Sequence, residues 1–435
     1  MKKGGTQKFL SVFISRLFSN NSSIHKQQKD VFMPPASPTL HPGRRAILAG
    51  GLATGGLWAS GLAARAATME NLPQPPSVIS TPPRQWGTDA PVTPLPDPDI
   101  LVLDPSFGNL AYANAGLKLA WRGGGWLEGP AWDSEGRFLL LSDTIRAQQY
   151  RYLWENGAVS VFRDTSYNSN GNAFDNEGRL VSCEHGMRRV VRWEHDGSCR
   201  VLADSYGGAP LNSPNDVAVH PDGSIWFTDP GYGDTIVEGH PDAPGAPANR
   251  AGAERWTLDG EVVTQFGGHR RQEDHVFRVD PATGDVRAVL TQQQLPDPNG
   301  IAFSPDGRIV YVISDGPGPG QDGHGGDQHI HAGDVAGGEV RNLRPFADMM
   351  LDGHQMTPDG MRTDIFGNLW CGANGPLGLC GVVVYNPHGH MIGRLRLPRG
   401  VSNLTFGGPK RDVLFMCAGD ALFTLQVNTQ GAAPS

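Results

Sequence analysis

Short alternations of apolar and polar residues recur along the chain, and a polar turn divides each of them in two. The clearest is NDVAVHPDGSIWFTD (215–229), in which an alternating segment and the turn P-D-G precede a segment rich in β-branched and aromatic residues. This pattern predicts a β-hairpin. Five further copies are EGPAWDSEGRFLLLSD (128–143), NGNAFDNEGRLVSCEH (170–185), NGIAFSPDGRIVYVISD (299–315), DGMRTDIFGNLWCGA (359–373) and NLTFGGPKRDVLFMCA (403–418). Six similar hairpins predict a repeat fold.

The copies begin 42, 45, 84, 60 and 44 residues apart. The short intervals match one four-stranded propeller blade, and insertions account for the longer two, so we predict an all-β, six-bladed β-propeller. The apolar segment 117–121 is expected to close the ring by completing the blade of the carboxyl-terminal strands. The insertion at about 233–272 is predicted to form a lid or rim loop. The Gly-rich segment 316–331 contains three histidines, and a flexible exposed loop is expected there rather than a metal tract.

Each copy opens on a side chain that carries an oxygen. In a propeller the innermost strand of each blade lines the central channel, so these six side chains are expected to form a ring. Two of them are carboxylates that would neutralise one divalent cation, and the asparagines would supply further oxygens, a set that suits calcium, magnesium or manganese. We therefore predict a metal site at the central channel. The ring residues are Glu128, Asn170, Asn215, Asn299, Asp359 and Asn403.

The elements EGPAW, LNSPNDVAVHPDGSIWFTDPGYG, PNGIAFSPD, PDGMRTDIFGNLWC and VSNLTFGGP follow one another between residues 97 and 428. They resemble the superfamily of gluconolactonase, regucalcin (senescence marker protein) and luciferin-regenerating enzyme, and most of all its bacterial gluconolactonases. The resemblance implies a metal-dependent six-bladed propeller with Glu128, Asn299 and Asp359 as metal ligands and Asn215 as a substrate contact. Ser213 stands where the regucalcin branch has Arg.

The resemblance further implies hydrolysis of a small-molecule sugar lactone such as gluconolactone, with one divalent cation. Ca²⁺ is the expected ion, with Mg²⁺, Mn²⁺ and Zn²⁺ as alternatives. Asp359 is the predicted proton acceptor for the attacking water. His185 and Tyr232, near the ends of second hairpin strands, are predicted to contact the substrate, although a solvent-exposed strand-end role suits His185 equally. Hydrolysis of another ester or phosphoester, and a non-catalytic ligand-binding propeller, stay open as alternatives.

Residues 1–67 contain Arg44 and Arg45 before a mildly apolar run that ends in A-R-A, which predicts a twin-arginine export signal and a periplasmic protein. Met33 is an alternative start. Residues 68–96 are predicted to be a Pro-rich linker or strap, 97–428 the propeller, and 429–435 a flexible tail. Cleavage after Ala66 would leave 27 basic and 43 acidic residues, a net charge of −16, which argues against nucleic acid as a partner. The expected partners are the lactone and the export machinery, with no membrane span after cleavage.

The five cysteines have no CxxC spacing. Because twin-arginine substrates fold in a reducing cytoplasm, buried free thiols are expected, with Cys371–Cys380 and Cys183–Cys199 as alternative pairs. A GxSxG motif is absent from the sequence, so a serine esterase mechanism has no support.

Overall fold

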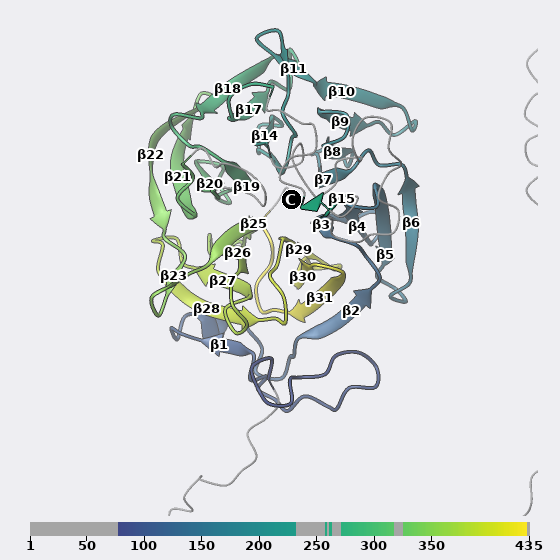
Figure 1. The fold of residues 1–435 in the computed structure, drawn as a ribbon, viewed down its shortest axis with the longest axis vertical. Helices are drawn as coiled ribbons and strands as arrows, with labels where there is room; N and C mark the ends of the chain where they lie inside the picture. The colour runs from purple at the N-terminus through teal and green to yellow at the C-terminus, as the bar shows by residue number, and fades with distance from the viewer. Residues whose placement is uncertain (1–76, 232–256, 259–260, 263–270, 317–324, 433–435) are drawn as a thin grey trace, which may run out of the picture. The chain divides into compact units, whose positions relative to one another are not determined.

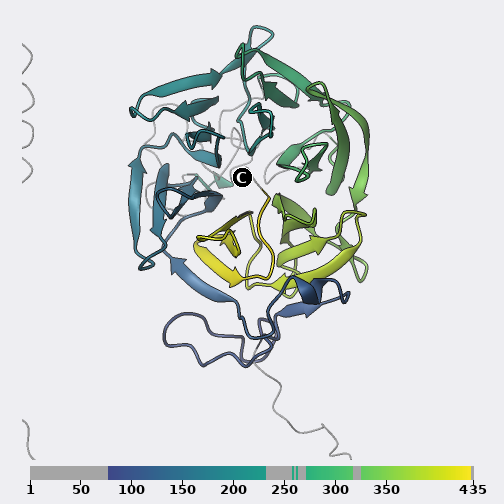
Figure 2. The ribbon, with the colours of Figure 1, turned by 180° about the vertical axis from the view of Figure 1, so that it is seen from behind.

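The computed structural model describes residues 77–231, 257–258, 261–262, 271–316 and 325–432. Within these ranges six four-stranded antiparallel blades surround a central axis (Figure 1), and Figure 2 shows the same blades from behind. The predicted six-bladed propeller is therefore confirmed. The innermost strands of the blades, in chain order, are β3 (Leu127–Asp133), β7 (Ser169–Phe174), β13 (Val217–Val219), β19 (Pro298–Phe303), β25 (Thr357–Thr363) and β29 (Asn403–Gly407).

The remaining strands of each blade lie progressively further from the axis. The second strands are β4 (Phe138–Asp143), β8 (Leu180–Glu184), β14 (Ile225–Asp229), β20 (Ile309–Ser314), β26 (Leu369–Asn374) and β30 (Val413–Ala418). The third strands are β5 (Gln148–Leu153), β9 (Arg189–Trp193), β17 (His275–Val279), β21 (His329–Ala336), β27 (Gly381–Tyr385) and β31 (Ala421–Gln426). The outer strands are β6 (Val159–Asp164), β10 (Cys199–Ala203), β18 (Val286–Thr291), β22 (Glu339–Ala347), β28 (Met391–Arg396) and β2 (Lys118–Arg122).

Each predicted hairpin forms the two inner strands of one blade, with antiparallel pairing across its polar turn. The ring closes as expected, because β2 pairs with β31 and completes the last blade from the amino-terminal side. A further amino-terminal strand, β1 (Ile100–Val102), adds a fifth strand to the blade of β25 by pairing with β28. Strands from the amino-terminal and carboxyl-terminal parts of the sequence therefore pair where the ring closes.

Apolar side chains that alternate along the strands pack between neighbouring blades rather than in one central core. Trp226 and Phe303 come from adjacent blades and meet edge to face with ring centroids 5.3 Å apart, and Trp132 stacks on Phe415 at 6.0 Å across the closing pair of blades. Buried clusters of this kind join most successive blades. The apolar residues are thus used between blades, and polar residues are left to line the channel.

The remaining described elements lie outside the blades' four strands. They are the 3₁₀ helix η1 (Phe107–Asn109) and the short hairpins β11 (Ser205–Tyr206) with β12 (Ala209–Pro210), β15 (Thr257–Leu258) with β16 (Glu261–Val262), and β23 (Met350–Leu351) with β24 (His354–Gln355). None of the helices in the described part of the chain has the length and apolarity needed to cross a membrane.

The amino-terminal segment before the blades is held by a buried ion cluster. The guanidinium of Arg84 contacts Asp97 at 2.8 Å and Asp99 at 3.0 Å, and Arg396 of β28 contacts Asp99 at 3.1 Å. Trp86 packs edge to face on Phe423 of β31. These contacts fasten the segment to the blades that close the ring.

At the other end of the chain, part of the predicted flexible tail is ordered against a blade. Asp364 and Gly431 form a β-bridge, and the Ala432 amide donates to the Thr363 carbonyl. The expectation of a tail from residue 429 is therefore wrong for residues 429–432. All five cysteines are free, as expected, but Cys199 is exposed rather than buried.

Candidate active site in the central channel

The six predicted ring residues occupy equivalent places around the axis. Each lies within two residues of the start of an innermost strand, and each innermost strand contacts that of the next blade, with β29 returning to β3. The side chains are sheltered: Glu128 is 4 % exposed and Asn299 6 % exposed, and Asp359 is half-buried. Contacts also cross the channel, because the amide of Asn403 donates to a carboxylate oxygen of Asp216 at 3.4 Å.

A local irregularity places these side chains. In three blades the pairing between the inner strands shifts register at the ring residue and the glycine that follows it, and in the first blade it shifts just after Glu128, at Gly129 and Pro130. A bulge of this kind twists the strand and redirects its side chains. The glycines also allow the blades to approach: a Cβ on Gly300 would overlap the carbonyl oxygen of Asp359, and one on Gly129 that of Asn170. The X-Gly pairs therefore set both the direction and the tight spacing of the ring.

Neighbouring groups orient Glu128. One carboxylate oxygen accepts a hydrogen bond from the Trp126 indole N–H at 3.3 Å, and the other accepts one from the Gly129 amide at 3.3 Å. Asp143, at the end of the second strand, accepts hydrogen bonds from the amides of Gly125 and Trp126 and so fixes the approach to Glu128. Burial raises the pKa of Asp143 despite these hydrogen bonds.

Asp315 orients Asn299. The Asn299 side-chain nitrogen donates to a carboxylate oxygen of Asp315 at 3.0 Å. An ionised carboxylate only accepts hydrogen bonds, so the NH₂ group of Asn299 must face Asp315 and its carbonyl oxygen must point elsewhere. The carbonyl oxygen of Asn299 is thereby left available as a candidate ligand, because outer hydrogen-bond partners commonly orient metal ligands in this way.

Asn170 and Asn403, which are not among the three ligands that the family resemblance implies, differ from each other. Asn403 orders the ring through hydrogen bonds, since its oxygen accepts from the Leu404 amide and its nitrogen donates to Asp216. The Oδ1 atom of Asn170 is buried without a hydrogen-bond partner among the described residues. A buried carbonyl oxygen normally has a partner. Asn170 is therefore a further candidate oxygen ligand beside the three that the family resemblance implies.

A buried ion pair lies beneath the ring and was not predicted. Arg362 of β25 contacts Asp216 at 3.3 Å, and both side chains are almost completely buried. Asp216 also accepts a hydrogen bond from the Ile301 amide at 3.2 Å. The repeats contain a signal for this pair: Asp216 stands where four other copies have Gly, and Arg362 stands where four others have Ala. A charged residue at each of two positions that are otherwise mostly small could have identified this ion pair from the sequence.

The sequence profile of the family described as the SMP-30/Gluconolactonase/LRE-like region matches residues 126–419. The chain belongs to this family. The matched range begins just before Glu128 and ends just after β30, so it includes all six ring positions.

Several known proteins are similar over much of the propeller. The gluconolactonase of Zymomonas mobilis is 29% identical over 326 residues, which are 70% of this chain and 80% of the relative. A lactonohydrolase of Aspergillus oryzae is 28% identical over 234 residues, 50% of this chain and 45% of the relative. The structure of a gluconolactonase from Xanthomonas campestris superimposes with a TM-score of 0.61 at 30% identity, covering 79% of this chain and 99% of that one. The calcium-binding protein regucalcin of Agrobacterium tumefaciens shares the fold, with a TM-score of 0.53 at 16% identity over 72% of this chain and 94% of that one.

The predicted substrate contacts of this family member have different environments. His185 follows β8 and is fully buried, so the alternative of a solvent-exposed strand-end histidine is wrong. Another histidine, His354, is exposed on the β23–β24 hairpin. Tyr232 lies outside the described residues, as does most of the insertion at 233–272.

The segment before Asn215 is rigidly held. Asp229 accepts hydrogen bonds from the amides of Asn212 and Ser213, both at 2.9 Å, which is the turn-fixing role that strand-end acids of this kind are expected to have. The hydroxyl of Ser213 donates to the Pro230 carbonyl at 2.7 Å. Ser213 thus has a structural role at the place where the regucalcin branch has Arg, and the adjoining Asn215 is presented from a fixed backbone.

Proposed function

We propose that the protein hydrolyses a sugar lactone, of the gluconolactone type, to the aldonic acid. The observation that carries this proposal is the ring of oxygen-bearing side chains, which has Glu128 and Asp359 as its charged members. The similarity to a gluconolactonase and a lactonohydrolase supports the same class of substrate. Hydrolysis of the ring ester needs a positioned carbonyl, a water molecule and a proton acceptor, and the ring offers candidates for each role.

A divalent cation fits the donor set. All the candidate ligands are oxygens, two of them charged, which is the chemistry preferred by Ca²⁺ and shared by Mg²⁺ and Mn²⁺. The fixed carbonyl oxygen of Asn299 and the unpartnered oxygen of Asn170 support the fit. Glu128, Asn299 and Asp359 would hold the ion. When bound, the cation would polarise the lactone carbonyl and stabilise the developing oxyanion.

The side chains would then divide the remaining work. Asp359, the more accessible of the two acids, would accept a proton from the attacking water, whose oxygen bonds to the carbonyl carbon. As the ring C–O bond breaks, that proton would pass to the departing alkoxide. Asn215 and His185 would orient the lactone through its hydroxyls, and we propose the same role for Tyr232.

The test separates a ligand from a proton acceptor. Asp359→Asn keeps an oxygen but removes the base, so kcat should fall by about 100-fold or more, the scale of general-base catalysis, while metal stays bound. Glu128→Gln should weaken metal affinity instead, and excess metal should restore much of its activity. The assay is turnover of a lactone panel by chelated and metal-restored protein, with metal content measured in parallel.

Two results would refute parts of this assignment. Equal rescue of both variants by excess metal would reduce Asp359 to a ligand. If the wild-type protein hydrolyses no lactone with any metal, the proposed lactonase activity is excluded. Turnover of other esters or phosphoesters would then distinguish another hydrolase from a ligand-binding propeller.

We also propose export to the periplasm by the twin-arginine route. The support is the Arg44–Arg45 pair and the A-R-A sequence before residue 67, which lie outside the described residues. The lactone would then be met outside the cytoplasm.

A further inference from the structure

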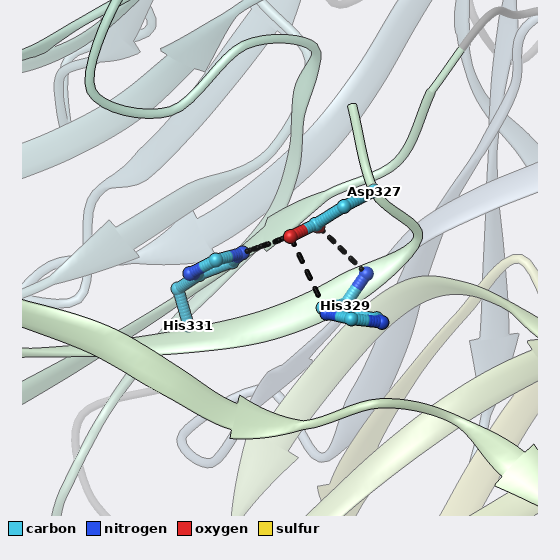
Figure 3. A group of neighbouring side chains, drawn as sticks. All are labelled: Asp327, His329 and His331. Carbon is cyan, nitrogen blue, oxygen red and sulfur yellow. Dashed lines mark hydrogen bonds and ion pairs between the residues drawn. The ribbon is translucent and has the colours of Figure 1, made fainter. Parts of the chain in front are cut away.

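A second cluster of ligand atoms lies on the blade of β19, away from the ring. Asp327, His329 and His331 place their ligand atoms within 4.8 Å of one another (Figure 3). The Asp327 carboxylate is 3.3 Å from Nδ1 of His329 and 3.0 Å from Nε2 of His331. Both histidines belong to β21, so the expectation of a flexible loop through residue 331 is wrong for them.

The strand geometry makes this cluster possible. Side chains two residues apart on a strand share a face. Ile330 and Ala332 belong to the apolar cluster shared with the next blade, whereas His331 lies opposite Val312, which belongs to the cluster on the other face. The two imidazoles therefore stand side by side on one face of β21.

The chain before β21 folds Asp327 back over these imidazoles. Gln328 adopts a left-handed conformation with φ of 60°, which is uncommon for a residue other than glycine and is often found at functional sites. The carbonyl of Gln328 accepts a hydrogen bond from Gln355 at 3.2 Å, and the Gly326 amide donates to Asp297 at 3.0 Å. These contacts on both sides of Asp327 fix the direction of its carboxylate.

The cluster remains open to solvent on one side. The side chain of His331 is 13 % exposed, that of His329 30 %, and that of Asp327 41 %. An ion could therefore enter without unfolding the strand, and three protein ligands would leave a position for water. The donors also differ from those of the ring, because two imidazole nitrogens and one carboxylate suit Zn²⁺ and related transition metals, whereas oxygens alone suit Ca²⁺.

We infer that Asp327, His329 and His331 form a second metal site, selective for Zn²⁺-type ions and independent of the channel ring. The site lies at the same end of the blade as the ring. His329 pairs with Ser314, and Ser314 pairs with Pro298, the residue before Asn299. Two strand spacings, about 10 Å, thus separate His329 from the start of the ring strand. The inferred ion would occupy the rim of the channel.

Zn²⁺ titration of the purified protein tests this inference. The protein is stripped of metal, saturated with Ca²⁺ to fill the ring, and titrated with Zn²⁺ by calorimetry. One equivalent of Zn²⁺ should bind. His329→Ala, His331→Ala or Asp327→Asn should each lower the Zn²⁺ affinity by at least about 10-fold, because losing even an outer-shell partner of a metal site costs about that much. Zn²⁺ should raise the Tm of the wild type and leave that of Asp327→Asn unchanged.

Two controls make the result specific. The double variant His388→Ala/His390→Ala removes another histidine pair with the same spacing, both exposed, and should bind Zn²⁺ like the wild type. Glu128→Gln should also keep the Zn²⁺ equivalent. If Glu128→Gln abolishes Zn²⁺ binding while His331→Ala keeps it, the ion occupies the ring and the second site is refuted. A wild type that takes up no Zn²⁺ under these conditions refutes it as well.

Discussion

The ion pair beneath the ring gives a prediction whose size can be worked from the structure. Arg362→Met removes the guanidinium that faces Asp216 at 3.3 Å and keeps a side chain of similar length. The Asp216 side chain is 1 % exposed, so its charge cannot be solvated in place of the lost partner. Its two other partners, the Ile301 amide and the Asn403 side chain, are neutral. The variant therefore leaves an uncompensated buried carboxylate.

Breaking a buried pair in this way costs about 3–5 kcal/mol, whereas replacing both partners with neutral groups is often close to neutral. We expect the free energy of unfolding of Arg362→Met to fall by that amount. This is a large fraction of the total unfolding free energy of a folded protein, which is typically about 5–15 kcal/mol. The double variant Asp216→Asn/Arg362→Met should recover most of the loss. Asp216 links β13 to β19, β25 and β29, so the single variant should also disturb the ring and lower lactone turnover.

Urea unfolding followed by tryptophan fluorescence and circular dichroism measures these differences. The three proteins are compared at one pH, and lactone turnover is measured on the same preparations. A single variant within about 1 kcal/mol of the wild type would show that the pair lies in a wetter environment than its burial indicates. A double variant less stable than the single one would refute the argument that the unpaired charge is the cause.

Three further outcomes are expected. Gly300→Ala places a Cβ against the Asp359 carbonyl, so it should lower stability by about 1–3 kcal/mol and reduce lactone turnover. Gly108→Ala places its Cβ in open space and should change neither quantity. Equal effects of the two variants would contradict the packing argument. Burial raises the pKa of Asp364 above its ordinary value, so the folded state binds that proton more tightly than the unfolded state. The unfolding free energy of the wild type relative to Asp364→Asn should therefore fall as the pH rises from about 4, and a flat difference across urea titrations would disprove it. Arg44→Lys with Arg45→Lys should retain the precursor in the cytoplasm, and normal periplasmic recovery on fractionation would exclude the twin-arginine route.

The blades could be predicted because each is specified locally. A hairpin needs an alternating segment, a turn and a second strand within about 16 residues, so six copies reveal six inner pairs without knowledge of distant contacts. The closing strand β2 was also predictable, because a propeller must complete its last blade. The place of β1 was not, since a three-residue edge strand carries too little pattern to identify β28 as its partner.

The site was predictable in position but not in detail. The opening residues of the repeats gave the ring, because equivalent positions on the inner strands come together around the axis. The orientation of Asn299 depends on Asp315, and the pairing of Asp216 with Arg362 joins residues 146 apart in sequence. Periodicity does not encode such contacts. His329 and His331 were assigned to a loop because glycines precede them, although β21 begins at His329.

The chemistry of the channel lies where the repeats depart from their own pattern. Asparagine opens four of the six copies, glycine is the second residue in four and alanine the fourth residue in four, a pattern that gives a neutral, closely packed ring. Glu128 and Asp359 replace Asn, Asp216 replaces Gly, and Arg362 replaces Ala. Because Asp216 and Arg362 neutralise each other beneath the ring, the ring itself keeps a charge of −2 from its two opening acids. That charge matches the one divalent cation proposed for the ring, and the buried pair would stabilise the ring without competing for this cation.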